Sequence, residues 1–187
     1  LLISSDKGLA GAFNAINSVF LGWLDGTSQL GARLDACVVR ANRAPVGGVQ
    51  KAAVEIGALG MSSEAAFRIL NCYIEQQHLA GNGILLKGSV SANEHGYQVL
   101  NNYIDGAGNA AAGGSGVGVE VENGVNGAII VGNTFNQWFQ GITIDNTSGV
   151  STIIAWPNLF ADTIDTDTVI TGGTTGIVVS FDHGSLS

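Results

Sequence analysis

The chain has 187 residues, of which 45% are hydrophobic and only 12% are charged, with a formal net charge of −8. A soluble domain usually carries about 25% charged residues, so the fold or a partner subunit must bury an unusually large share of this chain. The acidic excess argues against a nucleic-acid-binding protein, because affinity for phosphate backbones comes from clustered Lys and Arg. No apolar stretch is long enough for a transmembrane helix, so we expect no membrane insertion.

Glycine is abundant in the chain and proline is scarce. The 28 glycines favour many turns over long helices. The sequence opens on Leu1-Leu2-Ile3, without an initiator Met and without the basic, apolar and small-residue segments of a signal peptide. We therefore expect residues 1–187 to form a single domain that belongs to a longer protein.

In chain order, a first short pattern recurs: an apolar residue, two variable positions, a small polar residue or Cys, one variable position and an apolar residue. The clearest copies span residues 69–74, 99–104 and 130–135. Weaker copies precede and follow them, at Ala15–Ser18–Phe20, at Leu34–Cys37–Val39 and, with one extra residue, at Ile154–Asn158–Phe160.

A second pattern alternates with the first and consists of Gly followed by alternating apolar and polar residues. It occurs at 83–87, 118–122, 141–145 and 176–180, and without the leading Gly at 54–57. Strict alternation predicts a half-buried strand. A helix is excluded at these places, because apolar residues two positions apart do not share a helix face.

The two patterns recur in the same order along the chain, which indicates a repeat architecture. Neighbouring copies of the first pattern are 19 to 35 residues apart, so insertions such as the Ala- and Gly-rich stretch 106–116 must fall in loops. Stacked coils explain both features. The sequence therefore predicts an all-β fold, a right-handed parallel β-helix.

Stacking would align equivalent residues into rows. We expect two inward aliphatic rows, Val54–Ile84–Val119–Ile142–Ile177 and Ile56–Leu86–Val121–Ile144–Val179. The polar positions of the first pattern predict a third row, Ser18–Cys37–Cys72–Asn102–Asn133–Asn158. Asn tolerates positive φ and bonds neighbouring backbone groups, so this row is interpreted as a turn ladder in preference to a glycan-contact surface. Cys37 and Cys72 fall on adjacent coils, and we expect both thiols to be reduced.

The motifs VLNNYI (99–104), IVGNTF (130–135), GVEVEN (118–123) and GITIDN (141–146) resemble the pectate-lyase-like family of right-handed β-helices. That superfamily includes pectate lyases, polygalacturonases, alginate-modifying enzymes and bacteriophage tail spikes. The resemblance, over roughly residues 13–180, implies a polysaccharide ligand. Likeness to tail spikes further implies a homotrimer at a virion surface or outside the cell. Fold alone does not identify the reaction.

Outward positions of the second pattern carry the predicted catalytic residues. One outward row would be Gly57–Lys87–Glu122–Asp145–Ser180, and the other Glu55–Leu85–Glu120–Thr143–Val178. Carboxylates one coil apart lie about 5 Å from each other, and those two positions apart on a strand about 6.7 Å. These separations overlap those of glycosidase carboxylate pairs. We therefore predict Glu120, Glu122 and Asp145 as catalytic carboxylates and Lys87 as a substrate-binding residue. The competing interpretation is that Lys87 simply pairs with Glu122 across the row.

Trp138 and Trp156 are predicted to stack on a sugar ring, with core packing as the alternative for both. No His or Cys spacing predicts a zinc site, and no cofactor is expected. Asp162, Asp165 and Asp167 offer oxygen ligands that suit Ca²⁺, although the run lacks the glycine and distal glutamate of an EF-hand loop and also fits a Thr-rich exposed strand.

The sequence thus predicts a β-helix that recognises and hydrolyses a polysaccharide. A lyase is less favoured, because Arg33, Arg40, Arg43 and Arg68 do not fall on the outward rows of the second pattern, where a pectate-lyase base would be expected. The alternative is a non-catalytic shaft or carbohydrate-binding adhesin of a virion or cell surface.

Overall fold

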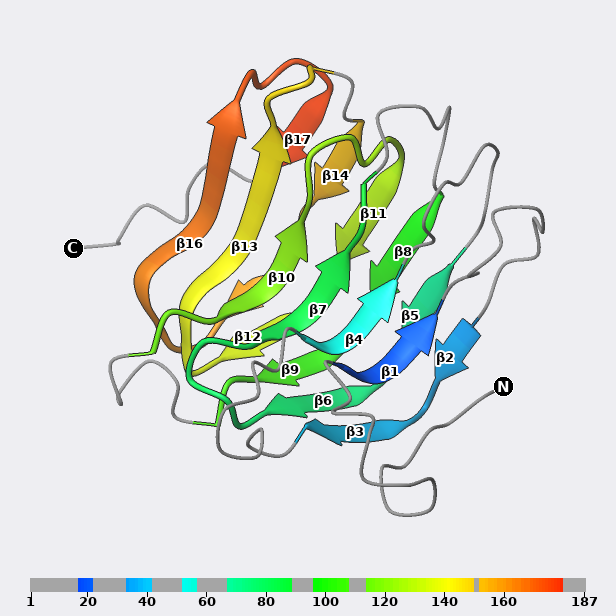
Figure 1. Ribbon diagram of the computed structural model, residues 1–187, viewed down its shortest axis with the longest axis vertical. Coiled ribbons are helices and arrows are strands. Elements are labelled where there is room, and N and C mark those ends of the chain that lie inside the picture. The colour runs from blue at the N-terminus through cyan, green and yellow to red at the C-terminus, as the bar shows by residue number, and fades with distance from the viewer. Residues whose placement is uncertain are drawn as a thin grey trace, which may run out of the picture.

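The computed structural model describes residues 17–21, 33–41, 52–56, 67–88, 96–107, 114–149 and 152–179, with the backbone alone at 17–21 and 163–166. In these parts of the chain, seventeen β-strands form three sheets, and every pairing between strands is parallel. Each strand pairs with the strand three positions away in the chain, so each coil contributes one strand to each sheet (Figure 1). The predicted all-β parallel β-helix is confirmed.

Sheet A contains the longest strands and holds the copies of the second sequence pattern that begin at residues 54, 83, 118 and 141. Its strands in spatial order are β1 (Asn17–Leu21), β4 (Ala52–Ile56), β7 (Asn82–Leu86), β10 (Val117–Val121), β13 (Trp138–Asn146) and β16 (Thr163–Gly172).

The first sequence pattern divides between the other two sheets, with a bend at its polar position. Sheet B holds β2 (Arg33–Asp35), β5 (Arg68–Leu70), β8 (Tyr97–Leu100), β11 (Ala128–Val131), β14 (Ile153–Ala155) and β17 (Ile177–Val179). Sheet C holds β3 (Val38–Ala41), β6 (Tyr73–Gln76), β9 (Tyr103–Asp105), β12 (Thr134–Asn136) and β15 (Leu159–Phe160). A coil therefore has three strands, whereas the sequence analysis distinguished only two patterns per repeat, because the first pattern spans two strands.

The inward rows of sheet A are confirmed over four coils. Val54, Ile84, Val119 and Ile142 pair in register and are buried. The predicted fifth members are wrong, because Ile177 and Val179 lie in sheet B opposite β14. The next residues of the sheet A rows are Thr168 and Ile170 on β16. Alternation marks any strand of this solenoid, so the Gly-led segment at 176–180 resembled sheet A although it belongs to sheet B.

The start of the described chain needs a similar correction. Residues 17–21 form β1 in sheet A, where Val19 pairs with Val54 and Phe20 with Glu55. Ser18 therefore does not belong to the polar row of the bend, and the proposed weak copy of the first pattern around it is wrong.

Glycines recur within the sheet A strands because aromatic and aliphatic side chains of the core approach the backbone there. A Cβ atom at Gly118 would lie 2.4 Å from Cδ1 of Phe135, and one at Gly141 would lie 2.3 Å from Cε1 of Phe160. Phe135 and Phe160 stack inside the coils, with ring centroids 5.1 Å apart. The recurrent Gly of the second pattern is thus a packing requirement of the core.

A ladder of asparagines lines the bend between sheets B and C. Asn133 Oδ1 accepts hydrogen bonds from the backbone N–H and the side-chain Nδ2 of Asn102, at 3.0 and 2.9 Å. Asn158 Oδ1 likewise accepts hydrogen bonds from the backbone N–H and the side-chain Nδ2 of Asn133, both at 3.0 Å. Each Nδ2 also donates to a main-chain carbonyl of the preceding coil, as Asn133 does to Val99 at 2.9 Å. The turn-ladder interpretation is confirmed.

At the first four described positions of the ladder, the positive φ of the bend belongs to the residue before the ladder position. Ala36, Asn71, Asn101 and Gly132 have φ between 50° and 71°. The sequence interpretation assigned the positive φ to the ladder residues themselves. The structure corrects this by one position toward the N-terminus. The ladder asparagines are selected instead by their buried hydrogen bonds.

Cys37 and Cys72 occupy the first two described positions of this ladder as free thiols, as expected. Each Sγ donates to a carbonyl two residues earlier, at 3.1 Å from Asp35 O and Leu70 O respectively. Burial raises the pKa of the Cys72 thiol.

In the described parts of the chain, no helix is long and apolar enough to cross a membrane.

Candidate functional site

The predicted catalytic carboxylates lie on the outer face of sheet A, in two neighbouring coils. Glu120 pairs in register with Leu85 on one side and Thr143 on the other. Val121 pairs with Ile144, so Glu122 and Asp145 follow in adjacent coils. Strand geometry places their backbones about 4.8 Å apart, and those of Glu120 and Glu122 about 6.7 Å apart. The structure thus brings the three carboxylates onto one surface.

Lys87 and Glu122 form an ion pair across this face. Their Nζ and Oε1 atoms are 2.7 Å apart, and each side chain is about a quarter exposed. The backbone ladder continues beneath them, with Lys87 N donating to Ile56 O and Glu122 N to Leu86 O. Lys87 therefore pairs with Glu122, as the alternative interpretation of the sequence predicted. Such a cross-strand pair contributes about 0.2–1 kcal/mol.

Glu120 is hydrogen-bonded to the first residue of β7, in the neighbouring coil. Its Oε2 accepts a hydrogen bond from Nδ2 of Asn82, and Oδ1 of Asn82 accepts from Val117 N at 3.2 Å. The buried Gln76 in turn donates to Asn82 O at 3.1 Å. These bonds connect the carboxylate to the interior and fix its position relative to β10.

Asp145 lies near the end of β13 and closes a turn. Its Oδ1 accepts a hydrogen bond from Thr147 N at 3.0 Å. The neighbouring Ser148 N donates to Asn123 Oδ1 of the preceding coil at 2.9 Å. Asp145 therefore has a local structural role in addition to its place beside Glu122.

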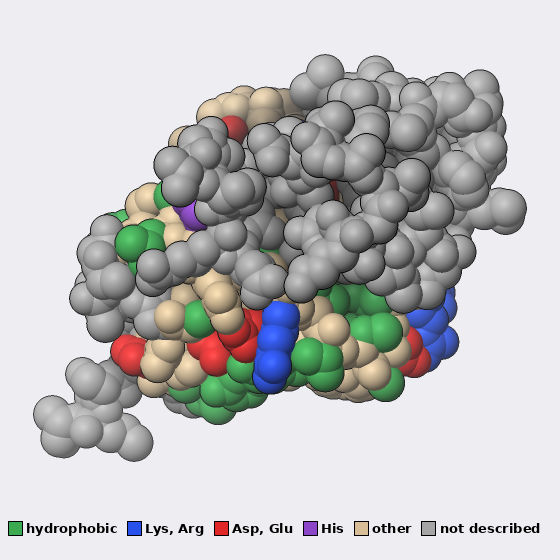
Figure 2. Space-filling view, turned by 60° about the horizontal axis from the view of Figure 1, so that its bottom comes forward, with side chains coloured by type: hydrophobic (Ala, Val, Ile, Leu, Met, Phe, Trp, Pro, Cys, Tyr) green, Lys and Arg blue, Asp and Glu red, His purple; other side chains and the backbone are tan. Residues whose placement is uncertain are grey.

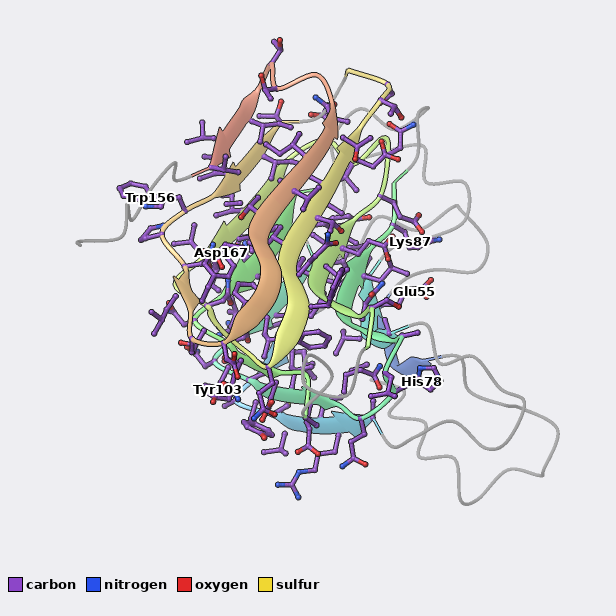
Figure 3. The ribbon with its side chains drawn as sticks, turned by 90° about the vertical axis from the view of Figure 1, so that its left-hand side faces the viewer. Glu55, His78, Lys87, Tyr103, Trp156 and Asp167 are labelled. Carbon is purple, nitrogen blue, oxygen red and sulfur yellow. The ribbon has the colours of Figure 1, made fainter. Side chains whose placement is uncertain are left out.

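The two predicted aromatic ligands differ in their surroundings. Trp138 is fully buried on β13, and its Nε1 donates to Ile104 O at 2.9 Å. It has no face open to a sugar, so its substrate-binding assignment is corrected to core packing. Trp156 is 50% exposed at the corner between β14 and β15. Figure 3 shows it on the opposite side of the coil from Lys87 and Glu55, so it does not join the carboxylates of sheet A.

Sequence reasoning missed a denser polar group on the outer face of sheet C, which we call the sheet C cluster: Arg40, Tyr73, Glu75 and Asp105. Glu75 and Asp105 are register partners on β6 and β9. The Tyr73 hydroxyl lies 3.1 Å from Asp105 Oδ2 and 3.3 Å from Glu75 Oε2. Arg40 Nε lies 3.3 Å from Glu75 Oε2. A carboxylate pair with an intervening donor is thus present outside sheet A.

Tyr73 remains a proton donor in this cluster. Burial, followed by the neighbouring charge of Asp105 and then that of Glu75, raises the pKa of Tyr73 to about 12. A sequence signal for the cluster existed, because an acidic residue follows the last apolar residue of the first pattern in two consecutive coils, at Glu75 and Asp105.

The aspartate run considered for Ca²⁺ lies beside and within β16. Asp162 and Asp167 are exposed, whereas the side chain of Asp165 is outside the described residues. Among the residues that the structure describes, no group of three or more His, Cys, Asp and Glu side chains is arranged to hold a metal ion.

Comparison of the chain with family models, with curated proteins and with solved structures gives no match.

Proposed function

We propose that this β-helix recognises a polysaccharide on its outer surface and hydrolyses it with the carboxylates of sheet A. The observation that carries the proposal is the placement of Glu120, Glu122 and Asp145 on one face of two adjacent coils. The resemblance of the repeat motifs to pectate-lyase-like enzymes and phage tail spikes supports the same ligand class. An extracellular or virion-surface location follows from that ligand.

The contacts of these carboxylates suggest a division of roles. The ion pair with Lys87 requires the carboxylate form of Glu122, which suits a nucleophile or a general base. Glu120 and Asp145 lie on either side of it and are the candidates for the general acid. The spacing of such a pair determines the stereochemical outcome: about 5–5.5 Å for retention and about 6.5–9.5 Å for inversion. Lys87 would position both the substrate and the carboxylate of Glu122.

The test is a cleavage assay on a panel of neutral and acidic polysaccharides, with detection of new reducing ends and of absorbance at 235 nm. We expect new reducing ends without new absorbance, and loss of activity in Glu120→Gln, Glu122→Gln and Asp145→Asn. Glu55→Gln is the matched control, because Glu55 lies on the same face two coils from Glu120. New absorbance at 235 nm would instead indicate a lyase. Full activity in all three variants would refute this site.

A non-catalytic shaft or adhesin is the second candidate. It is favoured by the structural partner of each carboxylate: Lys87 for Glu122, Asn82 for Glu120 and the Thr147 N–H for Asp145. Glycan binding without cleavage by the folded wild type would favour this candidate.

A homotrimer is also part of the proposal. Sheet B carries a row of exposed aliphatic side chains, Ile129, Ile154 and Val178, in register on its outer face. Exposed apolar rows of this kind are often covered by another subunit. Analytical ultracentrifugation should give a trimer, and Ile154→Glu should give a monomer; a monomeric wild type would refute this part.

A further inference from the structure

We propose that the outer face of sheet C binds an uncharged sugar ring of the glycan, between Tyr103 and Leu159 and above Thr134. The inference rests on the proposed function and adds a second ligand surface, of stated chemistry, away from sheet A. It starts from a row of side chains that pair in register along the solenoid axis, Val38–Tyr73–Tyr103–Thr134–Leu159.

This row contains an aromatic column that stops at a small residue. The rings of Tyr73 and Tyr103 stack with centroids 5.6 Å apart and planes 8° apart, and the guanidinium of Arg40 lies 5.9 Å from the Tyr73 centroid. In the next coil the position is Thr134, and in the coil after that it is Leu159. The small side chain of Thr134 thus lies between the larger side chains of Tyr103 and Leu159, and we call this place the step at Thr134.

The dimensions of the step suit one ring. Tyr103 and Leu159 are two strand spacings apart, about 9.6 Å. A ring between them would contact each at van der Waals distances of roughly 3.5–4 Å. Tyr103 is 40% and Leu159 61% exposed, so both have apolar surface available for contact. A ligand ring would thus continue the column that the tyrosines begin.

Polar groups with fixed positions lie along one side of the step. Asp105 and Asn136 pair in register, and each lies two residues beyond the row, on the same outer face. Asp105 is held by Ala107 N at 2.9 Å and by the Tyr73 hydroxyl at 3.1 Å, and Asn136 Nδ2 approaches Asp105 Oδ1 at 3.3 Å. A carboxylate beside an amide can accept from and donate to adjacent hydroxyls. With an aromatic face, these are the groups that recognise a pyranose.

The local charge determines which sugars fit. The sheet C cluster contains two carboxylates and one cation, and the cation, Arg40, pairs with Glu75. The whole chain has a net charge of −8. A polyanionic glycan would be repelled by this field, whereas an uncharged glycan would not. Figure 2 shows acidic, basic and hydrophobic side chains side by side on the part of the surface that lies at the bottom of Figure 1.

The step is also separate from the candidate catalytic face. Figure 3 shows Tyr103 at the lower edge of the coil, away from Lys87 and Glu55. Substitutions at the step should therefore leave the carboxylates of sheet A in place, and the two surfaces can be tested independently.

The test is a titration of the full chain with uncharged gluco-, galacto- and manno-oligosaccharides and, as the anionic probe, with oligogalacturonate of the same length, followed by calorimetry and by amide NMR shifts. Thr134→Tyr is the decisive variant, since it extends the tyrosine column and fills the step. We expect a folded protein whose affinity for the uncharged probe falls by about tenfold or more. Tyr103→Ala should show the same loss, whereas the matched controls Thr134→Ser and Tyr103→Phe should bind like the wild type.

Each outcome supports or overturns the inference. Shifts centred on Tyr103, Asp105 and Asn136, lost in folded Thr134→Tyr, support it. Undiminished binding by Thr134→Tyr, no binding of any uncharged probe, or tighter binding of oligogalacturonate overturns it. The experiment also distinguishes failure of the proposed sugar binding at the step from failure of the proposed hydrolysis at sheet A. Cleavage that depends on Glu122, together with glycan binding that does not depend on Thr134, would refute the step alone. Binding that depends on Thr134, without any cleavage, would refute hydrolysis alone.

Discussion

The asparagines at the bend between sheets B and C and the carboxylates on the outer face of sheet A are both polar residues placed by the repeat, but in opposite surroundings. Asn102 and Asn133 are buried, and their hydrogen bonds run from coil to coil. Glu120 and Glu122 are partly exposed, and their side-chain partners are individual residues, Asn82 and Lys87.

This difference separates a polar role in stability from one available for chemistry. A buried amide that loses its partner costs the full desolvation of the groups left behind, so the ladder determines where each coil bends. A partly exposed carboxylate can exchange its partner for a ligand at small cost. Function should therefore be sought on the outer faces, and stability should respond most strongly inside.

The largest effect should come from the ladder. Asn133→Ala removes the acceptor of two hydrogen bonds from Asn102 and the donor to Val99 and Asn158. Several buried groups lose partners at about 1–3 kcal/mol each, so the free energy of unfolding should fall by about 3–5 kcal/mol in urea denaturation. Asn136→Ala, on the outer face, should cost less than about 1 kcal/mol. Equal losses in the two variants would contradict the distinction between inside and outside.

The next effect concerns the glycines within the sheet A strands. Gly118→Ala places a Cβ within 2.4 Å of the Phe135 ring and should destabilise the protein by about 1–3 kcal/mol through overpacking. At Gly173, by contrast, an added Cβ has no atom within 4 Å, so Gly173→Ala serves as the control. Thermal unfolding of both variants measures the difference, and an unchanged Gly118→Ala would show that the packing explanation is wrong.

A smaller effect is expected from the ion pair on the outer face. A double-mutant cycle of Lys87→Met and Glu122→Gln should give a coupling of about 0.2–1 kcal/mol, reduced at high salt because the pair is partly exposed. A coupling of several kcal/mol that is insensitive to salt would place this pair with the buried ladder instead.

The last effect is on stability and appears only at alkaline pH. Because the folded protein raises the pKa of Tyr73 to about 12, it holds that proton more tightly than the unfolded chain, whose tyrosine pKa is about 10. The resulting stabilisation is complete below pH 10 and is lost as the pH rises from 10 to 12. Tyr73→Phe should flatten this part of the pH–stability curve. A curve for Tyr73→Phe that is as steep as that of the wild type would contradict the assignment.

Sequence reasoning predicted the parts of the molecule that repeat. The inward rows from Val54 to Ile142 and the ladder from Cys37 to Asn158 were identified because each coil carries a similar residue at the equivalent position. The error at Ile177 has the same origin, since strands of sheets A and B share alternation and only the neighbouring coil distinguishes them.

The candidate site was less accessible to this reasoning. The outer rows do not repeat, so the sequence placed Glu120, Glu122 and Asp145 on one face and offered Lys87 as a partner of Glu122, but it did not identify Asn82 as the partner of Glu120. The burial of Trp138 depends on its packing against another coil, where its Nε1 donates to Ile104 O, and the contact of Tyr73 with Glu75 and Asp105 depends on the register of sheet C. These features follow from three-dimensional neighbours that no short motif records.

The most direct measurement for the central claim, that this β-helix acts on polysaccharide from its outer faces, is the reducing-end assay on the polysaccharide panel, with wild type, Glu122→Gln and the control Glu55→Gln compared after all three are shown to be folded. We expect cleavage by the wild type and by Glu55→Gln, and no cleavage by Glu122→Gln. Cleavage by Glu122→Gln at the wild-type rate, or neither binding nor cleavage of any glycan by the folded wild type, would contradict the account.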